Sequence, residues 1–132
     1  MTKETDLQIP VSPGELLDKL TILQIKRERF TDPVKRGFVV YELQALNSVW
    51  TNSQLSNQTI EDVVVQLKQV NEQLWDIEDE LRQLEADKEF SERFIYQARQ
   101  VYITNDRRAA LKLEINQLLG AKIVEHKQHP GY

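Results

Sequence analysis

Residues 59–84 read TIEDVVVQLKQVNEQLWDIEDELRQL, and apolar side chains recur in this stretch at alternating intervals of three and four residues. Such intervals place side chains on one face of an α-helix, as the a and d positions of a heptad repeat. Val64 and Trp75 widen the apolar stripe, so we expect this helix to contact partners on more than one side. The uninterrupted series consists of Ile60, Val63, Leu67, Val70, Leu74, Ile77, Leu81 and Leu84.

Helix start and stop signals predict three further helices around this one. Ser12 and Pro13 start a helix over about residues 13–30, and Asp32 and Pro33 start another over about residues 33–50. Thr59 is the expected N-cap of the heptad helix. A turn near residues 87–88 leads to a second long helix, over about residues 90–119, that ends at Gly120.

The expected fold class is therefore all-α. A long antiparallel helical hairpin, residues 59–87 and 90–119, carries two shorter helices packed on it. The 132 residues suit a single domain. Within it we expect an extended segment over residues 1–11, a loop over residues 51–58 and an irregular tail over residues 121–132.

Composition excludes several classes of function. The net charge of −4 argues against non-specific binding to nucleic acid or to an anionic membrane, because both need a basic face. The chain has no cysteine, which removes disulfides, thiol nucleophiles and thiolate zinc sites and fits a reducing cytoplasm. No secretory signal and no apolar run of about 20 residues is present, so we expect a cytoplasmic protein without a membrane span.

Polar residues interrupt the apolar stripe of the last helix. Asn105 and Arg108 fall where the repeat calls for core residues, and a buried polar group without a partner costs about 1–3 kcal/mol. If the turn is centred near residue 88, Asn71 lies opposite Asn105, and the two amides can bond each other. Arg108 then faces no acidic group on the preceding helix. Its partner is expected on the helix over residues 13–30 or on another subunit.

These polar residues define a candidate ligand site. Cations from the first and last helices can converge on an anion, for which arginine offers a two-pronged fork. The simpler alternative is ion pairing with neighbouring acidic groups such as Asp18, Glu28 and Asp106. The candidate site residues are Lys19, Asn71, Trp75, Glu78, Tyr102, Asn105, Asp106, Arg107, Arg108 and Lys112.

No metal site, cofactor or catalytic framework is expected. Asp76 and Asp79 have the spacing of a metal-binding pair on a helix, but a solvated acidic face explains them more simply. His126 and His129 lie beyond Gly120 in the tail. The glycines are scattered singly, so there is no phosphate-binding loop. A non-enzymatic role is therefore favoured.

Three segments resemble an uncharacterised bacterial protein family whose members carry a domain of unknown function. They are IPVSPGELLDKLTILQIK at residues 9–26, LWDIED at 74–79 and YITNDRRA at 102–109, which continues to Lys112, Ile115 and Asn116. The resemblance implies an all-helical fold and no particular reaction. Its members are often encoded near glycosyltransferases of surface polysaccharides, which implies a link to such systems. The ending EHKQHPGY departs from the family pattern.

Two hypotheses follow for the function. In the first, the chain is a helical module that forms a homo-oligomer or docks to a protein partner. In the second, the Asn105–Arg108 region belongs to a pocket that binds or converts a small anion, such as a phosphorylated sugar, a nucleotide or a dicarboxylate. Neither hypothesis involves nucleic acid or a membrane.

Overall fold

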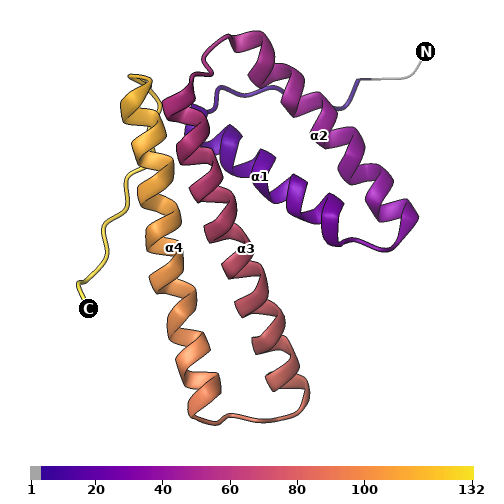
Figure 1. Cartoon of the computed structure of the whole chain (residues 1–132), viewed down its shortest axis with the longest axis vertical. Coiled ribbons are helices and arrows are strands. Elements are labelled where there is room, and N and C mark those ends of the chain that lie inside the picture. The colour runs from indigo at the N-terminus through magenta and orange to yellow at the C-terminus, as the bar shows by residue number, and fades with distance from the viewer. Residues whose placement is uncertain (1–3) are drawn as a thin grey trace.

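The computed structural model describes residues 4–132, and this part of the chain forms four α-helices and no strand. The helices are α1 (Pro13–Arg29), α2 (Pro33–Ser53), α3 (Gln58–Ala86) and α4 (Glu92–Leu118). The long helices α3 and α4 form an antiparallel hairpin, and α1 and α2 pack beside one half of it (Figure 1). The prediction of an all-α fold built on a long hairpin is confirmed.

The first two helices begin at the predicted caps. The Ser12 hydroxyl accepts a hydrogen bond from the Glu15 N–H at 3.1 Å, and the Asp32 carboxylate accepts one from the Val34 N–H at 2.9 Å. A proline occupies the first helical position after each cap. Proline suits this position because its missing N–H would have no partner there.

The connection between α2 and α3 is shorter than the predicted loop over residues 51–58. Helix α2 continues through Ser53, because buried Trp50 anchors its last turn on the core. Helix α3 begins at Gln58, and its N-cap is Asn57, whose side-chain oxygen accepts a bond from the Ile60 N–H at 2.9 Å. The prediction of Thr59 as the N-cap was wrong. Asparagine caps at least as well as threonine, and Asn57 comes first in the chain.

The core is built around α1, with buried side chains from all four helices. Helix α1 packs against each of the other three, whereas within residues 4–132 α2 packs only on α1. The end of the hairpin near the α3–α4 turn therefore projects as a pair of helices without a third layer (Figure 1). The buried apolar cluster consists of Leu17, Leu20, Leu23, Val39, Leu43, Trp50, Ile60, Val63, Leu67 and Ile115.

A close contact fixes the start of α1 on α4. The Gly14 N–H donates to the side-chain oxygen of Asn116 at 2.7 Å. A Cβ atom at Gly14 would lie 2.5 Å from the Lys112 carbonyl oxygen, which is backbone and cannot turn aside. Only glycine therefore allows the two helices to approach this closely.

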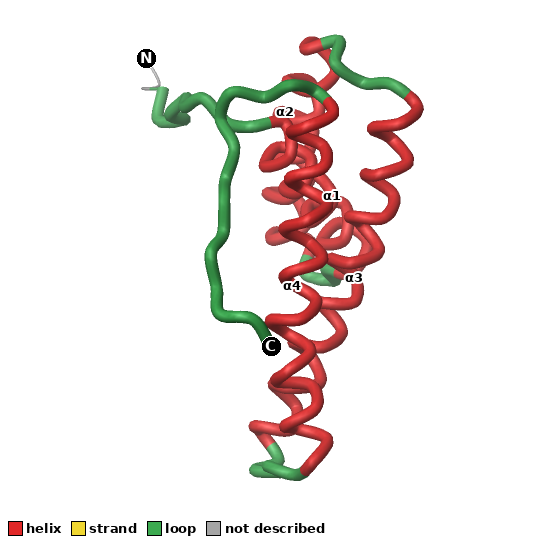
Figure 2. Tube along the Cα trace, turned by 90° about the vertical axis from the view of Figure 1, so that its left-hand side faces the viewer, coloured by secondary structure: helices red, strands yellow, loops and turns green. Residues whose placement is uncertain are grey.

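The segment after α4 turns back along that helix (Figure 2). The Tyr132 ring meets the Tyr102 ring edge to face, with centroids 5.2 Å apart, and the Tyr132 hydroxyl donates to Asp106 at 2.5 Å. Over residues 4–132, no helix combines the length and the apolar character required to cross a bilayer.

Candidate functional site

A buried ion pair joins α1 to α4 at the polar interruption. The Asp18 side chain is 2% exposed and accepts two bonds from Arg108, from Nε to Oδ1 at 2.9 Å and from Nη2 to Oδ2 at 2.5 Å. This two-pronged geometry matches the arginine fork to the carboxylate. Of the two sources expected for the partner of Arg108, the structure places the carboxylate on α1.

Asn71 brings α3 into the same cluster. Its side-chain N–H₂ donates to Asp18 Oδ1 at 3.0 Å and to the Thr21 hydroxyl at 2.9 Å. The Thr21 hydroxyl donates in turn to the Asp18 backbone carbonyl at 2.8 Å. We call Asp18, Thr21, Asn71 and Arg108 the polar cluster. It satisfies three buried polar residues by hydrogen bonds that cross three helices.

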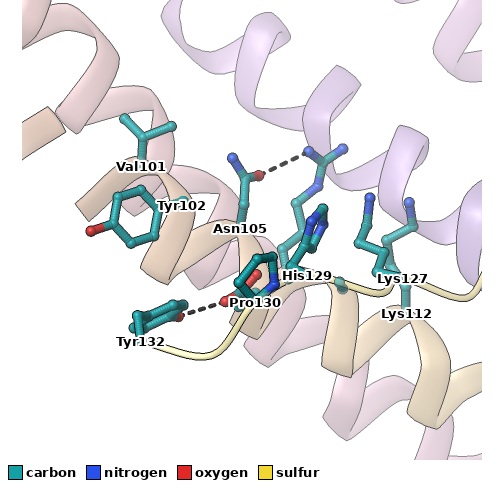
Figure 3. Close-up of a pocket in the computed structure, with 11 residues that line it drawn as sticks. Val101, Tyr102, Asn105, Lys112, Lys127, His129, Pro130 and Tyr132 are labelled. Atoms are coloured by element: carbon teal, nitrogen blue, oxygen red, sulfur yellow. Dashed lines mark hydrogen bonds between the residues drawn. The ribbon is translucent and has the colours of Figure 1, made fainter. Parts of the chain in front are cut away.

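The predicted bond between Asn71 and Asn105 was wrong. Helix α1 covers the hairpin at this level, and the carboxylate of Asp18 attracts the Asn71 amide more strongly than a neutral amide would. Asn105 instead accepts a long bond of 3.5 Å from Arg108 Nη1 (Figure 3). Because arginine can only donate, this bond turns the Asn105 oxygen toward the guanidinium and its N–H₂ away.

Thr104 occupies the fully buried position that the repeat assigned to Asn105. Thr104 is 1% exposed, while Asn105 is only half-buried. An α-helix has 3.6 residues per turn, so a strict heptad drifts around the helix and the seam moves by one residue along α4. The Thr104 hydroxyl has no hydrogen-bond partner among the described residues, and Asn105 faces the side of the hairpin near α1.

The charge of Arg108 is secured by its surroundings. The hydrogen bond to Asp18 raises the pKa of Arg108, the nearby charges of Asp18, Glu15 and Glu125 add to this effect, and burial opposes it. Arg108 is therefore held in its charged form beside Asp18. Removing one partner of a buried pair costs about 3–5 kcal/mol, because the other charge is left unpaired.

A cavity of about 400 Å³ opens beside the polar cluster, where α1 diverges from the hairpin. We call it the crease. Half of the predicted site residues line it: Asn71, Trp75, Glu78, Asn105 and Arg108. Ile22, Ile25 and Leu74 form apolar walls, and Asp79 and Arg82 complete the lining.

A second cavity of about 580 Å³, the tail groove, lies between α4 and the chain after it (Figure 3). The predicted residues Tyr102, Asp106 and Lys112 line it, and Asn105 and Arg108 border both cavities. Its basic side chains already have acidic partners. Lys112 pairs with Glu15 at 2.8 Å, and Lys127 pairs with Glu125 at 2.8 Å.

Two predicted site residues lie outside both cavities. Lys19 pairs with Glu42 of α2 at 3.0 Å, and Arg107 donates to Gln73 of α3 at 2.9 Å. Asp76, half of the predicted acidic pair, is bonded to Arg29 at 2.5 Å. Among residues 4–132, no three side chains of the metal-binding types form a group able to hold an ion.

The sequence interpretation missed Asp18 as a site residue and the tail residues Lys127, His129 and Pro130. A signal for Asp18 does exist. Gly14, Asp18, Thr21 and Ile25 follow each other at intervals of four, three and four, and all are buried. They form a second inward stripe on α1, whose polar members face the polar interruption of the hairpin. No comparable period locates the tail, because it is irregular.

Comparisons with known proteins bear on the whole chain. Residues 7–131 match the family described as a family of unknown function, DUF6165. No curated protein and no solved structure matches the sequence. The family match includes α1, α3 and α4, which carry the polar cluster, and the lining of the tail groove except Tyr132. Because the match spans nearly the whole sequence, the chain belongs to this family of unknown function.

Proposed function

We propose that this protein is a helical module that associates with a second copy of itself through the outer face of α2. The observation that carries the proposal is an exposed helix face without charge. Helix α2 buries Val39, Leu43 and Trp50 against the core. The opposite side of the helix carries Val34, Gly37, Phe38, Tyr41, Ala45, Ser48, Val49 and Asn52, which we call the α2 outer face.

The apolar members of this face are widely exposed. Phe38 is 74% exposed, Val34 68% and Tyr41 67%. Contiguous apolar patches on a protein surface commonly mark interaction sites. The centres of protein interfaces are rich in aromatic residues and poor in charge, and the α2 outer face has this composition.

The charged residues of α2 are turned to its flanks. Glu42 pairs with Lys19 of α1, and Arg36 Nε donates to the Arg27 carbonyl at 3.0 Å. Lys35 is the only other charged residue of the helix. In a chain that is 29% charged, an uncharged helix face running from residue 34 to residue 52 is unexpected for a solvated surface.

A second copy is the occupant that fits this face best. A two-fold interface places the same surface against itself, so charges of one sign would repel each other. The α2 outer face has none. Nothing in the single chain requires glycine at position 37, since a Cβ atom on Gly37 would meet nothing within 4 Å. Glycine costs about 1 kcal/mol in a helix, and close approach of another helix would offset that cost.

The test is the mass of the protein in solution. By light scattering at micromolar concentration, we expect twice the mass of one chain for the natural protein and a single-chain mass for Phe38→Glu. Val65→Glu on α3 is the matched control, because Val65 is also an exposed apolar residue, at 57%, but lies outside this face. A monomeric natural protein, or equal disruption by the control, would overturn the proposal.

We also propose where in the cell this module acts. The absence of cysteine supports a cytoplasmic location, because disulfides rarely form in the reducing cytoplasm. A role beside the enzymes of surface-polysaccharide assembly stays a prediction from the family resemblance. Fractionation of cells that express a tagged chain would check the location.

A further inference from the structure

The crease contains hydrogen-bond donors that the protein does not use. Arginine has five N–H groups, and Asp18 accepts one from Arg108 Nε and one from Nη2. Nη1 makes only the 3.5 Å bond to Asn105. The Asn105 N–H₂ has no acceptor in the described part of the chain. Arg108 is 29% exposed, so these donors can reach a ligand carboxylate.

Acidic groups without partners lie on the same cavity. Glu78 and Asp79 line the crease, and neither makes an ion pair or a side-chain hydrogen bond with any residue in 4–132. The charge of Arg108 is already balanced by Asp18. Glu78 and Asp79 would repel an anion, and Arg82 on the same cavity makes no ion pair with either of them. A simple anion is therefore a poor fit, while a ligand with both charges suits the cavity.

The spacing between the hydrogen-bond donors and the acidic groups of the crease suits a small molecule. Seven residues of helix, about 10 Å at 1.5 Å per residue, separate the level of Asn71 from that of Glu78. Side chains lean toward the N-terminus of their own helix. Glu78 therefore leans toward Asn71, and Asn105, on the antiparallel helix, leans toward Glu78. An α-amino acid with one hydrogen bond at each charged end spans roughly 8 Å, which is of the same order as the separation of the two levels.

Apolar walls lie between the donors and the acids. Ile22 and Ile25 come from α1, and Leu74 and Trp75 come from α3. The indole of Trp75 gives a broad surface for a planar or branched apolar group. The cavity of about 400 Å³ is within the range of small-molecule sites.

We propose that the crease binds a free α-amino acid with an apolar side chain. Arg108 and Asn105 hold its carboxylate, Glu78 and Asp79 hold its ammonium group, and Trp75 packs on its side chain. This site is independent of the α2 outer face, whose residues line no part of the crease. It replaces the small anion of the sequence-based hypothesis by a zwitterion, because both signs of charge converge there.

The test compares an amino acid with two analogues, each of which lacks one of its charged groups. Calorimetric titration with L-phenylalanine, 3-phenylpropionate and phenethylamine separates the contributions of the two charged ends. We expect phenylalanine to bind and each analogue to bind about tenfold more weakly or worse, because each lacks one charge-assisted hydrogen bond. A panel of leucine, isoleucine, methionine and tryptophan extends the search if phenylalanine is too large or too small.

Variants identify the site without breaking the ion pair. Asn105→Ala should weaken binding of the amino acid and of the carboxylate analogue. Glu78→Gln should weaken binding of the amino acid and should not weaken binding of the carboxylate analogue. Glu114→Gln is the control, because Glu114 is exposed on α4 and lines neither cavity. Circular dichroism of each variant verifies the fold.

Several outcomes would overturn the proposal. If 3-phenylpropionate bound as tightly as phenylalanine, the crease would be an anion site. If phenethylamine bound as tightly, it would be a cation site. No detectable binding of any ligand in the panel at millimolar concentration would also overturn the proposal. Repeating the titration on Phe38→Glu separates the two proposals. Binding retained in that variant shows a site that does not need self-association, whichever way the mass measurement falls.

Discussion

The two halves of the hairpin share one sequence pattern but differ in how they are covered. Near α1, Ile60 and Leu67 are fully buried, whereas farther along the same stripe Leu74 and Leu81 are only half-buried. The heptad is uninterrupted through both halves. Ile77 and Leu84, at the alternate heptad positions, stay buried in the projecting half. The pattern therefore predicts the apolar side of α3, but the row that contains Leu74 and Leu81 is fully buried only where a third helix covers the hairpin.

The two halves are also held by different forces. The covered half contains the polar cluster and the apolar core. The projecting half has a narrower buried seam, which includes Ile77 and Leu84. It also has surface bonds, with Arg93 donating to Glu80 at 2.5 and 2.8 Å and Gln97 donating to the same carboxylate. Exposed ion pairs contribute little to stability, so we expect the free energy of unfolding to be concentrated in the covered half.

The largest effect is expected from removing the buried carboxylate. Asp18→Ala leaves the half-buried Arg108 without its carboxylate partner and should lower the free energy of unfolding by about 3–5 kcal/mol. Urea unfolding followed by circular dichroism measures the change. The double variant Asp18→Leu with Arg108→Met should recover much of the loss. If the free energy of unfolding of Asp18→Ala lay within about 1 kcal/mol of that of the natural protein, the polar cluster would not be the main interaction that holds α1 on the hairpin.

Truncating one leucine in each half compares the two directly. Leu67→Ala should cost about 2–5 kcal/mol, because Leu67 is fully buried and a cavity remains. Leu81→Ala should cost clearly less, since Leu81 is half-buried and water already reaches it. The same unfolding experiment gives both values. Equal losses would mean that the projecting half is covered in solution by something else.

Two glycines offer a matched pair of substitutions. Gly14→Ala places a methyl group against the Lys112 backbone and should cost about 1–3 kcal/mol. Gly37→Ala meets nothing and should stabilise the single chain by up to about 1 kcal/mol through helix propensity. Thermal melts at low protein concentration measure both changes in stability, a loss for Gly14→Ala and a gain for Gly37→Ala. If α2 pairs with a second copy, Gly37→Ala should also weaken the dimer.

The smallest effect is a pH dependence confined to the projecting half. The hydrogen bonds from Arg93 and then from Gln97 lower the pKa of Glu80 below its usual range. The stabilisation is therefore fully present above the pKa of glutamate in the unfolded chain, and it is lost as the pH falls through the lower, folded pKa. Amide hydrogen exchange near the α3–α4 turn should accelerate over that window, and Glu80→Gln should remove the dependence. Acceleration that persists in Glu80→Gln would assign the effect to another group.

The fold was largely predictable because its signals are local. The heptad from Ile60 to Leu84 and the caps at Ser12 and Asp32 act within a few residues of each other. The exact seam of α4 was not predictable, because a one-residue drift decides between Thr104 and Asn105. Whether Asn71 would bond to an amide or a carboxylate depended on where α1 lies, which is tertiary information.

The residues expected in one candidate site are divided by the structure between the crease and the tail groove. Asn71, Trp75, Glu78, Asn105 and Arg108 do meet in one cavity, since helical spacing and the register of the hairpin place them together. Lys19 and Arg107 point to other partners, because charge alone gives no direction around a helix. The tail groove depends on an irregular segment, for which no period exists.

The bond between Asp18 and Arg108 joins residues 90 positions apart in the chain. A ribosome adds about 5–20 residues per second, so the first helix emerges several seconds before its partner on the last. During that interval α1 can pack on α2 and α3, and Asn71 can bond Asp18, but the Asp18 carboxylate lacks its charged partner. A nascent chain thus cannot complete the polar cluster until Arg108 has been added. The ion pair is therefore a late step of folding during synthesis.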